Sequence, residues 1–200
     1  MMEFPIIDGI PIIVSDLRTY ITHNVLPILK RDDLCSSIES IVGDCNGPDS
    51  PFNTQRQYLS SYGFDHYGDF DSKNSENKGI KPGSILNAQQ KAFKLYGKKP
   101  DDMIIDMGCS VGRTTFELSE KYDLPVIGID LNFGMIKKAS NILNQNVFSY
   151  PKRKTGVVFE NKNFPVKFRK KHNVDFWVCD AMNLPFKNNC FSFDRTVSHR

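Results

Sequence analysis

Residues 101–113, Asp-Asp-Met-Ile-Ile-Asp-Met-Gly-Cys-Ser-Val-Gly-Arg, decide the fold that we expect for this chain. The apolar residues 103–107 predict a buried strand, Gly108 and Gly112 flank a turn, and a helical pattern begins at Arg113. In α/β proteins, a strand followed by a glycine turn and a helix often forms a nucleotide-binding site at the carboxyl edge of the sheet. The stretch therefore predicts an α/β domain with a ligand site at this turn.

The chain after this stretch continues to alternate between strand and helix patterns. We expect further strands at 124–130, 174–179 and 190–198, and helices at 113–122 and 132–143. Strands that alternate with crossover helices indicate a Rossmann-like, doubly wound parallel sheet. Because no helix pattern follows the fourth strand, we expect the domain of residues 81–200 to be incomplete at its C-terminus.

Residues 1–80 predict an N-terminal extension made of a hairpin and helices. Asp8-Gly9 between Ile pairs is a two-residue hairpin signal, and helices are expected from 17 to 28 and from 34 to 42. Residues 55–62 predict one or two helical turns, and residues 63–80 predict a loop that contains aromatic side chains. The aromatics at 62–70, among them Tyr62, are interpreted as packing residues, with a lid over the ligand as the alternative. A helix at 84–96 leads into the α/β domain.

The composition is that of a globular protein, with 40% hydrophobic and 24% charged residues among 200. No apolar run approaches the roughly 20 residues of a membrane helix, and the N-terminus has no leader pattern. The five cysteines are scattered without a Cys-x-x-Cys pair, so we expect reduced thiols, no metal site and a cytoplasmic location.

Three acids stand at or near the carboxyl ends of the first three α/β strands, and these ends meet in one crevice of a parallel sheet. Asp130 follows Gly108 by 22 residues, the spacing at which a carboxylate accepts hydrogen bonds from ribose hydroxyls. Asp180 can accept from an adenine amine while the amide of Ala181 donates to the ring. Asp106 can orient the turn or meet a cationic amine. The sequence therefore predicts a nucleoside site.

A dinucleotide is a poor match for this site. The G-x-G-x-x-G pattern has Ser110 and Arg113 at its second and third positions, so two of three glycines are missing. Two glycines four residues apart with acids on both sides suit a cofactor with a cationic amino-acid tail.

Three motifs, Asp106-Met-Gly-Cys-Ser-Val-Gly112, Gly128-Ile-Asp130-Leu-Asn and Cys179-Asp180-Ala-Met-Asn-Leu-Pro-Phe186, occur in this order. With Phe193-Asp194 they resemble class I S-adenosylmethionine-dependent methyltransferases of the type 11 kind over residues 83–198. The resemblance implies that Gly108 to Gly112 wraps the methionine part, Asp130 holds the ribose, and Asp180 with Ala181 holds the adenine. The cofactor-binding set predicted from it also includes Asp106, Cys109 and Leu131.

Two smaller resemblances accompany this one. The sequence around Gly112 and the long insertion before residue 174 look most like the methyltransferase module associated with mercaptohistidine synthesis. Residues 4–14 resemble the end of a small Trm112-like zinc-ribbon module, whose Cys-x-x-Cys part is missing here, so metal binding does not carry over.

Methyl transfer needs little from side chains, because the sulfonium already activates the methyl group and the protein chiefly aligns the reactants. We therefore name no catalytic residue, and His199 is only a minor candidate for contact with substrate. Cys109 and Cys179 are interpreted as core residues rather than nucleophiles, and Arg113 as structural. The expected activity is methyl transfer to an unidentified small molecule.

Residues 150–173 form a basic insertion with eight Lys and Arg against one acid, Glu160. We expect a solvated flap with short strands at 157–159 and 166–168. One alternative is that its cations and aromatics dock RNA or protein for methylation, and the segment could equally cover a small acidic substrate. A second alternative is that the chain is a truncated remnant that binds the cofactor without catalysis.

Overall fold

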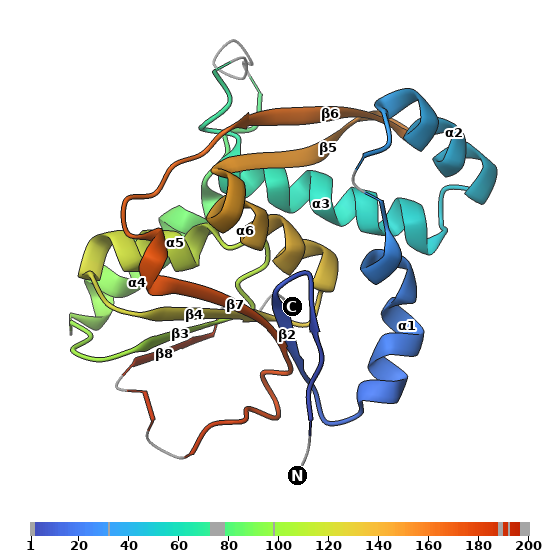
Figure 1. The fold of residues 1–200 in the computed structure, drawn as a ribbon. Coiled ribbons are helices and arrows are strands. Elements are labelled where there is room, and N and C mark those ends of the chain that lie inside the picture. Colours follow the sequence, from blue (N-terminus) through green and yellow to red (C-terminus); the bar gives the residue numbers. More distant parts are fainter. Residues whose placement is uncertain are drawn as a thin grey trace.

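A six-stranded, mostly parallel sheet forms the base of the protein (Figure 1). The computed structural model describes residues 3–31, 33–72, 79–97, 99–187, 190–191 and 193–196. The strand order is β1-β2-β7-β4-β3-β8, and every neighbouring pair is parallel except β1 with β2. The strands are β1 Ile6–Ile7, β2 Ile10–Ile13, β3 Ile104–Met107, β4 Val126–Asp130, β7 Val174–Cys179 and β8 Phe193–Thr196. This is the Rossmann-like α/β fold that the sequence predicts.

Helices α5 (Arg113–Tyr122) and α6 (Phe133–Gln145) lie on one face of this sheet, directly after β3 and β4 (Figure 1). Both begin where the sequence predicts, and the side chain of Asn132 caps α6 by accepting from the Met135 amide. Helix α4 (Ser84–Tyr96) packs beside α5 through Phe93. The crossover helices thus place the β3–α5 and β4–α6 turns next to each other at one sheet edge.

The N-terminal hairpin is part of the main sheet, whereas the sequence places it in an appendage. Asp8 and Gly9 have φ of 53° and 77°, as a tight hairpin turn requires, so the hairpin itself is confirmed. Strand β2 then pairs in parallel with β7, with Ile12 opposite Val178. Ile12 packs into the core on the helical face and Ile13 against the other face, and an interior strand needs apolar residues on both faces.

Helix α3 (Pro51–Tyr67) is much longer than the sequence predicts, and residues 63–67 are helical rather than loop. The helix follows α1 (Leu17–Leu29) and α2 (Ser36–Asn46), and Ser50 caps its start. Its apolar period is concealed because half of its buried positions carry polar side chains, namely Asn53, Arg56, Ser60 and His66. Tertiary packing of this face, rather than amphipathic patterning, stabilises the helix.

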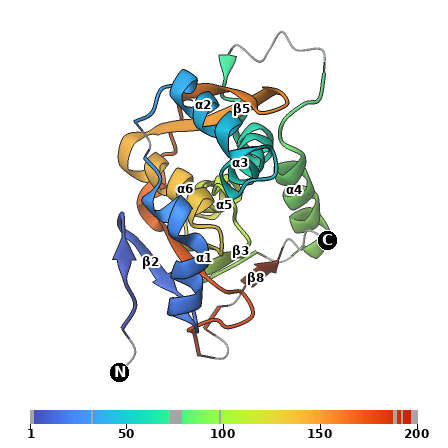
Figure 2. The ribbon, with the colours of Figure 1, turned by 90° about the vertical axis from the view of Figure 1, so that its right-hand side faces the viewer.

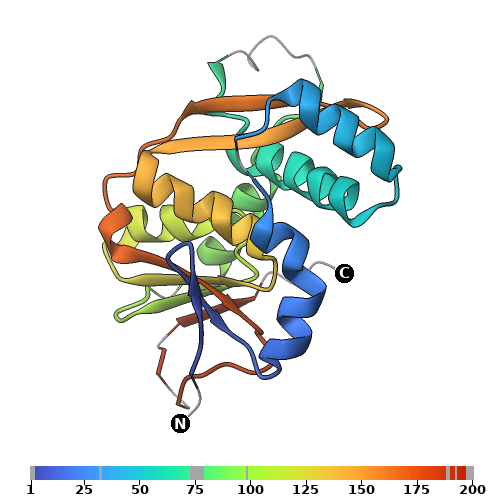
Figure 3. The same ribbon diagram turned by 45° about the vertical axis from the view of Figure 1, so that its right-hand side comes forward.

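The basic insertion is an ordered β-hairpin, not a flap with isolated short strands. Strands β5 (Val147–Thr155) and β6 (Val158–Pro165) pair antiparallel and lie along α3, as Figure 3 shows. Residues 166–168 are outside the strands, although Val166 and Phe168 are buried. The reason is that the aromatics of the insertion point inward, which gives the hairpin a buried face.

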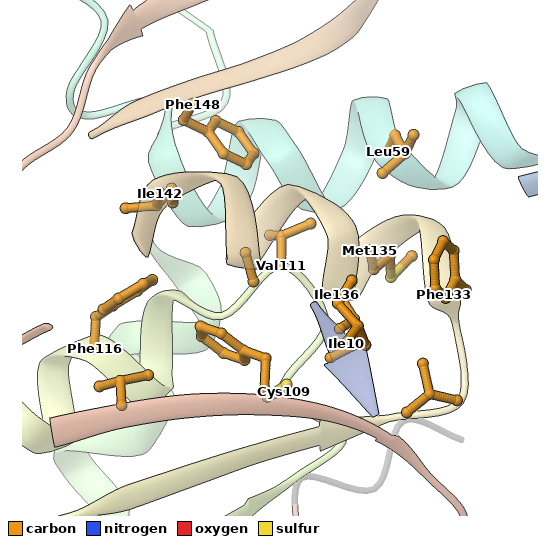
Figure 4. Close-up of a cluster of buried hydrophobic side chains, with 14 of the residues drawn as sticks. Ile10, Leu59, Cys109, Val111, Phe116, Phe133, Met135, Ile136, Ile142 and Phe148 are labelled. Carbon is orange, nitrogen blue, oxygen red and sulfur yellow. The ribbon is translucent and has the colours of Figure 1, made fainter. Parts of the chain in front are cut away.

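The main core lies between the sheet, α6, α3 and the hairpin. Figure 4 shows Cys109 and Val111 of the glycine turn beside Phe116 and Ile136, with Leu59 of α3 above. Seen from the side in Figure 2, α3 and β5 stack over the α5–α6 layer. The turn after β3 is therefore held from the sheet below and from α3 above.

No helix in the described part of the chain is long and apolar enough to cross a membrane. The division into residues 1–80 and 81–200 stays a prediction. His199 and the end of the fourth predicted strand lie outside the described residues.

Candidate functional site

The turn after β3 is a left-handed backbone corner. Gly108, Ser110 and Gly112 have φ of 72°, 55° and 83°. Such values are strained for residues with a Cβ, which explains glycine at two of the three positions. The amides of Gly108 and Cys109 both donate to the Ile129 carbonyl at the end of β4, at 2.8 and 3.0 Å. The corner is therefore fixed to the neighbouring strand.

Asp130, the last residue of β4, faces this corner. One carboxylate oxygen accepts from the Ser110 amide at 2.9 Å, and the other accepts from the Asn132 amide at 2.8 Å. Burial raises the pKa of Asp130 above its ordinary value, and these backbone hydrogen bonds offset part of the rise. Each oxygen keeps a further lone pair, so the carboxylate can still accept hydrogen bonds from a diol.

Asp106 orients the turn, which is one of the two roles that the sequence predicts for it. Its side chain is 1% exposed, and one oxygen accepts from the hydroxyls of Thr114 and Thr115 at 2.6 and 2.8 Å. Two hydroxyl donors from the first turn of α5 thereby tie the helix to β3. The other predicted role of Asp106, contact with a cationic amine, stays a prediction.

Gly112 is needed for packing inside the protein, and its predicted contact with a cofactor stays a prediction. A Cβ on Gly112 would lie 2.6 Å from Cζ of Phe176 and 2.7 Å from Cβ of Ala139. Cys109 is likewise a core residue, 1% exposed, and burial raises the pKa of its thiol. Burial also raises the pKa of Cys179 to about 11, so both thiols stay protonated and non-nucleophilic near neutral pH.

A cleft of about 340 Å³ opens above the turn. Four elements form its walls: the turn after β3, the end of β4, the start of α6, and α3. The lining residues are Tyr58, Tyr62, Gly108, Ser110, Asp130, Asn132 and Met135. The sequence identifies Gly108 and Asp130 as site residues but misses the other five, although Asn132 is recognised as a helix cap and Tyr62 as part of a possible lid. The volume is within the range of about 300–1,000 Å³ typical of small-molecule sites.

Asp180 and Ala181 lie just beyond β7, at the same sheet edge as Asp130. One carboxylate oxygen of Asp180 accepts a hydrogen bond from the Met182 amide at 2.9 Å, and the other oxygen takes no part in that hydrogen bond. Leu131 is 47% exposed next to Asp130, and Ala181 is exposed. None of these three residues lines the cleft. Their contacts with a cofactor stay predictions.

The N-terminal helices hold both loops of this cleft. Tyr67 at the end of α3 donates its hydroxyl to the Val111 carbonyl at 2.9 Å, and Tyr20 of α1 donates to the Leu131 carbonyl at 2.8 Å. Burial raises the pKa of Tyr20, so this hydroxyl remains a donor.

Two further contacts strengthen this attachment. Arg113 at the start of α5 forms a bidentate pair with Asp69 at 2.9 and 3.0 Å and donates to the His66 carbonyl, which confirms its structural role. Gln55 of α3 exchanges amide hydrogen bonds with Asn132. The cleft is thus built from both halves of the chain.

A parallel α/β sheet with a glycine turn after one strand and an acid at the end of the next is the framework of class I S-adenosylmethionine-dependent methyltransferases. Residues 105–200 match the family model described as "Methyltransferase domain". Over these residues, just under half of the chain, the protein matches a class I methyltransferase domain, a family whose members use S-adenosylmethionine.

Curated relatives match over a short stretch. Phosphoethanolamine N-methyltransferase 1 of Arabidopsis thaliana is 44% identical over 54 residues, covering 27% of this chain and 11% of that protein. Phosphoethanolamine N-methyltransferase of Triticum aestivum is 42% identical over 45 residues, covering 22% and 9%. The matched stretch spans only about a tenth of the length of these relatives.

Among solved structures, magnesium protoporphyrin IX methyltransferase from Synechocystis PCC 6803, a structure with bound SAM, is 18% identical. The match covers 58% of this chain and 50% of that chain, with a TM-score of 0.27.

Within the described residues, no group of three His, Cys, Asp or Glu side chains is arranged to hold a metal ion.

Proposed function

We propose that this protein transfers a methyl group from S-adenosylmethionine to a small-molecule acceptor. The observation that carries the proposal is Asp130, a partly buried carboxylate held by two backbone amides at the edge of the cleft. Its remaining lone pairs suit the two ribose hydroxyls of the cofactor. Gly108, whose backbone lines the cleft without a side chain, leaves room for the methionine part.

The bound cofactor would supply a methyl group activated by a positive sulfur. The chain's own groups then have two tasks, to hold that cation and to exclude water. The aromatic side chains of Tyr58 and Tyr62 form the α3 wall of the cleft, and aromatic faces attract cations. Burial, followed by the nearby charge of Asp130, raises the pKa of Tyr62, so its phenol stays protonated and serves as a hydrogen-bond group rather than a base.

We further propose that the acceptor is a small amine, with phosphoethanolamine as the first compound to test. Support comes from the relatives that share the matched stretch, which are named for that activity. We also place the protein in the cytoplasm, because all five cysteines are free.

Docking of RNA through the basic insertion receives little support. Its aromatics Tyr150, Phe159, Phe164 and Phe168 are each at most 9% exposed, so they are not available to stack on bases. Several of its cations are engaged within the protein: Lys154 and Lys162 pair with Glu160, and Lys170 pairs with Asp123.

The test is a transfer assay with S-adenosylmethionine carrying a labelled methyl group and a panel of acceptors. The panel contains phosphoethanolamine, simple amines, thiols, a carboxylic acid and total RNA. We expect label in a small molecule and none in RNA, and the Asp130→Asn protein should show much lower transfer. Label incorporated into RNA, with none in the small molecules, would overturn the proposal.

A further inference from the structure

A second and larger cavity, of about 500 Å³, lies between α3 and the β5–β6 hairpin, two elements that run side by side in Figures 1 and 3. None of its lining residues belongs to the cofactor cleft. They are Ser60, Ser61, Phe64, Gly79, Ile80, Lys152 and Arg153. The function proposed above makes no use of this cavity.

The two cavities lie on different flanks of α3. A helix turns by about 100° per residue, so Phe64 projects about 200° around the axis from Tyr62. Tyr62 lines the cofactor cleft, whereas Phe64 lines the second cavity, and the buried Leu59 and Gly63 lie between these flanks. A ligand in the second cavity would therefore occupy a site separate from the cofactor cleft.

The walls of the second cavity are firmly joined. The Arg153 amide donates to the hydroxyl oxygen of Ser60 at 2.8 Å, which fixes β5 against α3. Gly63 touches Tyr150 so closely that a Cβ would lie 2.6 Å from the ring. Nε of Arg153 donates to the Gly156 carbonyl at 2.7 Å, which holds the guanidinium at the hairpin turn. The α3 and β5 walls of the cavity are therefore held together by a hydrogen bond and by close packing.

The chemistry of the lining is cationic and apolar together. Lys152 and Arg153 bring two positive charges, and none of the described lining residues is acidic. The Lys152 ammonium lies 5.1 Å from the Phe64 ring centroid, and Ile80 exposes 87% of its surface.

We propose that this cavity is a second ligand site, which binds a compound with an anionic head group on a short apolar body. The head group lies between Lys152 and Arg153 with the Ser61 hydroxyl within the same lining, and the apolar body covers Phe64 and Ile80. A phosphate monoester suits the two cations best, because it carries close to two negative charges at neutral pH.

Binding is tested by titrating the ¹⁵N-labelled protein with matched probes and following the backbone amide resonances. The probes are hexyl phosphate, hexanoate, inorganic phosphate and hexylammonium. We expect saturable shifts at residues 60–64 and 152–153, strongest for hexyl phosphate and absent for hexylammonium. Hexanoate separates a general anion site from a phosphate site, and inorganic phosphate measures the contribution of the apolar body. Equal affinity for hexylammonium, or no saturable shift at these amides, would overturn the proposal.

Substitutions then separate this site from general attraction to a basic protein. Lys152→Met and Arg153→Met each remove one charge, and each should weaken hexyl phosphate binding by roughly three- to tenfold, as expected for partly exposed charged contacts. Ile80→Asp, at an exposed position, should weaken it as well. Lys167→Met removes an exposed cation of the same insertion outside the cavity and is the matched control. A loss as large in the control as in Lys152→Met would show that the cavity is not the binding site.

Discussion

Tyr67→Phe tests whether α3 supports the cofactor turn. Tyr67 is fully buried, and its hydroxyl donates to the Val111 carbonyl at 2.9 Å. Phenylalanine keeps the ring contact with Phe148, whose centroid is 4.1 Å away, but leaves the carbonyl without this donor. Loss of one buried hydrogen bond, with its partner left unsatisfied, destabilises a protein by about 1–2 kcal/mol. For a protein of this size, that predicts a melting temperature lower by about 3–6 °C.

The same substitution should weaken S-adenosylmethionine binding, because Val111 belongs to the turn that lines the cleft. We expect an affinity lower by roughly three- to tenfold, measured by calorimetry below the melting transition. Tyr122→Phe is the matched control, since its ring packs against Phe93 and it is far from the turn. If Tyr67→Phe melts and binds like the unchanged protein, α3 does not support the cofactor turn as described.

Three further predictions concern the turn and its neighbours. Burial raises the pKa of Asp130, and only its ionised form accepts hydrogen bonds from two ribose hydroxyls. Cofactor affinity should therefore fall on acidification, and the fall should begin at a pH above the ordinary carboxyl pKa of about 4. Calorimetry across pH should find no such fall in the Asp130→Asn protein. Gly112→Ala should lower the free energy of unfolding by about 2–4 kcal/mol in urea denaturation, since its Cβ would overlap Phe176 at a left-handed φ of 83°. Arg113→Lys should lower it by about 1–2 kcal/mol in the same assay, because lysine cannot form the bidentate pair with the half-exposed Asp69.

Each of these predictions has an outcome that contradicts it. Affinity that is constant down to about pH 4 would mean that Asp130 is not a cofactor ligand or is not raised in pKa. Gly79→Ala is the control for Gly112→Ala, because no described residue lies within 4 Å of a Cβ at this position and its φ is not left-handed. Equal stability of these two variants would contradict the packing argument. An unchanged free energy of unfolding in Arg113→Lys would show that the pair with Asp69 contributes little.

The strands and turns of the cofactor half could be predicted because local chemistry determines them. Buried parallel strands appear in a sequence as short apolar runs, and left-handed turns favour glycine. The predicted bounds of β3, β4, β7 and the start of α5 therefore agree closely with the observed ones. Asp130 was identified for the same reason, as an acid at the end of such a strand.

The rest of the site could not be predicted because it depends on contacts between distant segments. Tyr58 and Tyr62 reach the cleft only because α3 lies across the glycine turn, and α3 itself has polar residues at half of its buried positions. The many Lys and Arg residues of the basic insertion predict a solvent-exposed segment if only its charge is considered. The inward direction of Phe148 and Tyr150 in β5 becomes clear only when β5 is placed against α3. Nor does sequence spacing show that Asp106 is enclosed by Thr114 and Thr115.

The most direct test of the central claim is calorimetric titration of S-adenosylmethionine into the unchanged protein and into Asp130→Asn. The account predicts one site per chain with a dissociation constant roughly between 1 µM and 1 mM, and an affinity at least about tenfold weaker in the variant. Both proteins should melt cooperatively, so that a loss of binding is not a loss of fold. Equal binding by the two proteins, or no binding by the folded unchanged protein, would contradict the placement of the cofactor at Asp130.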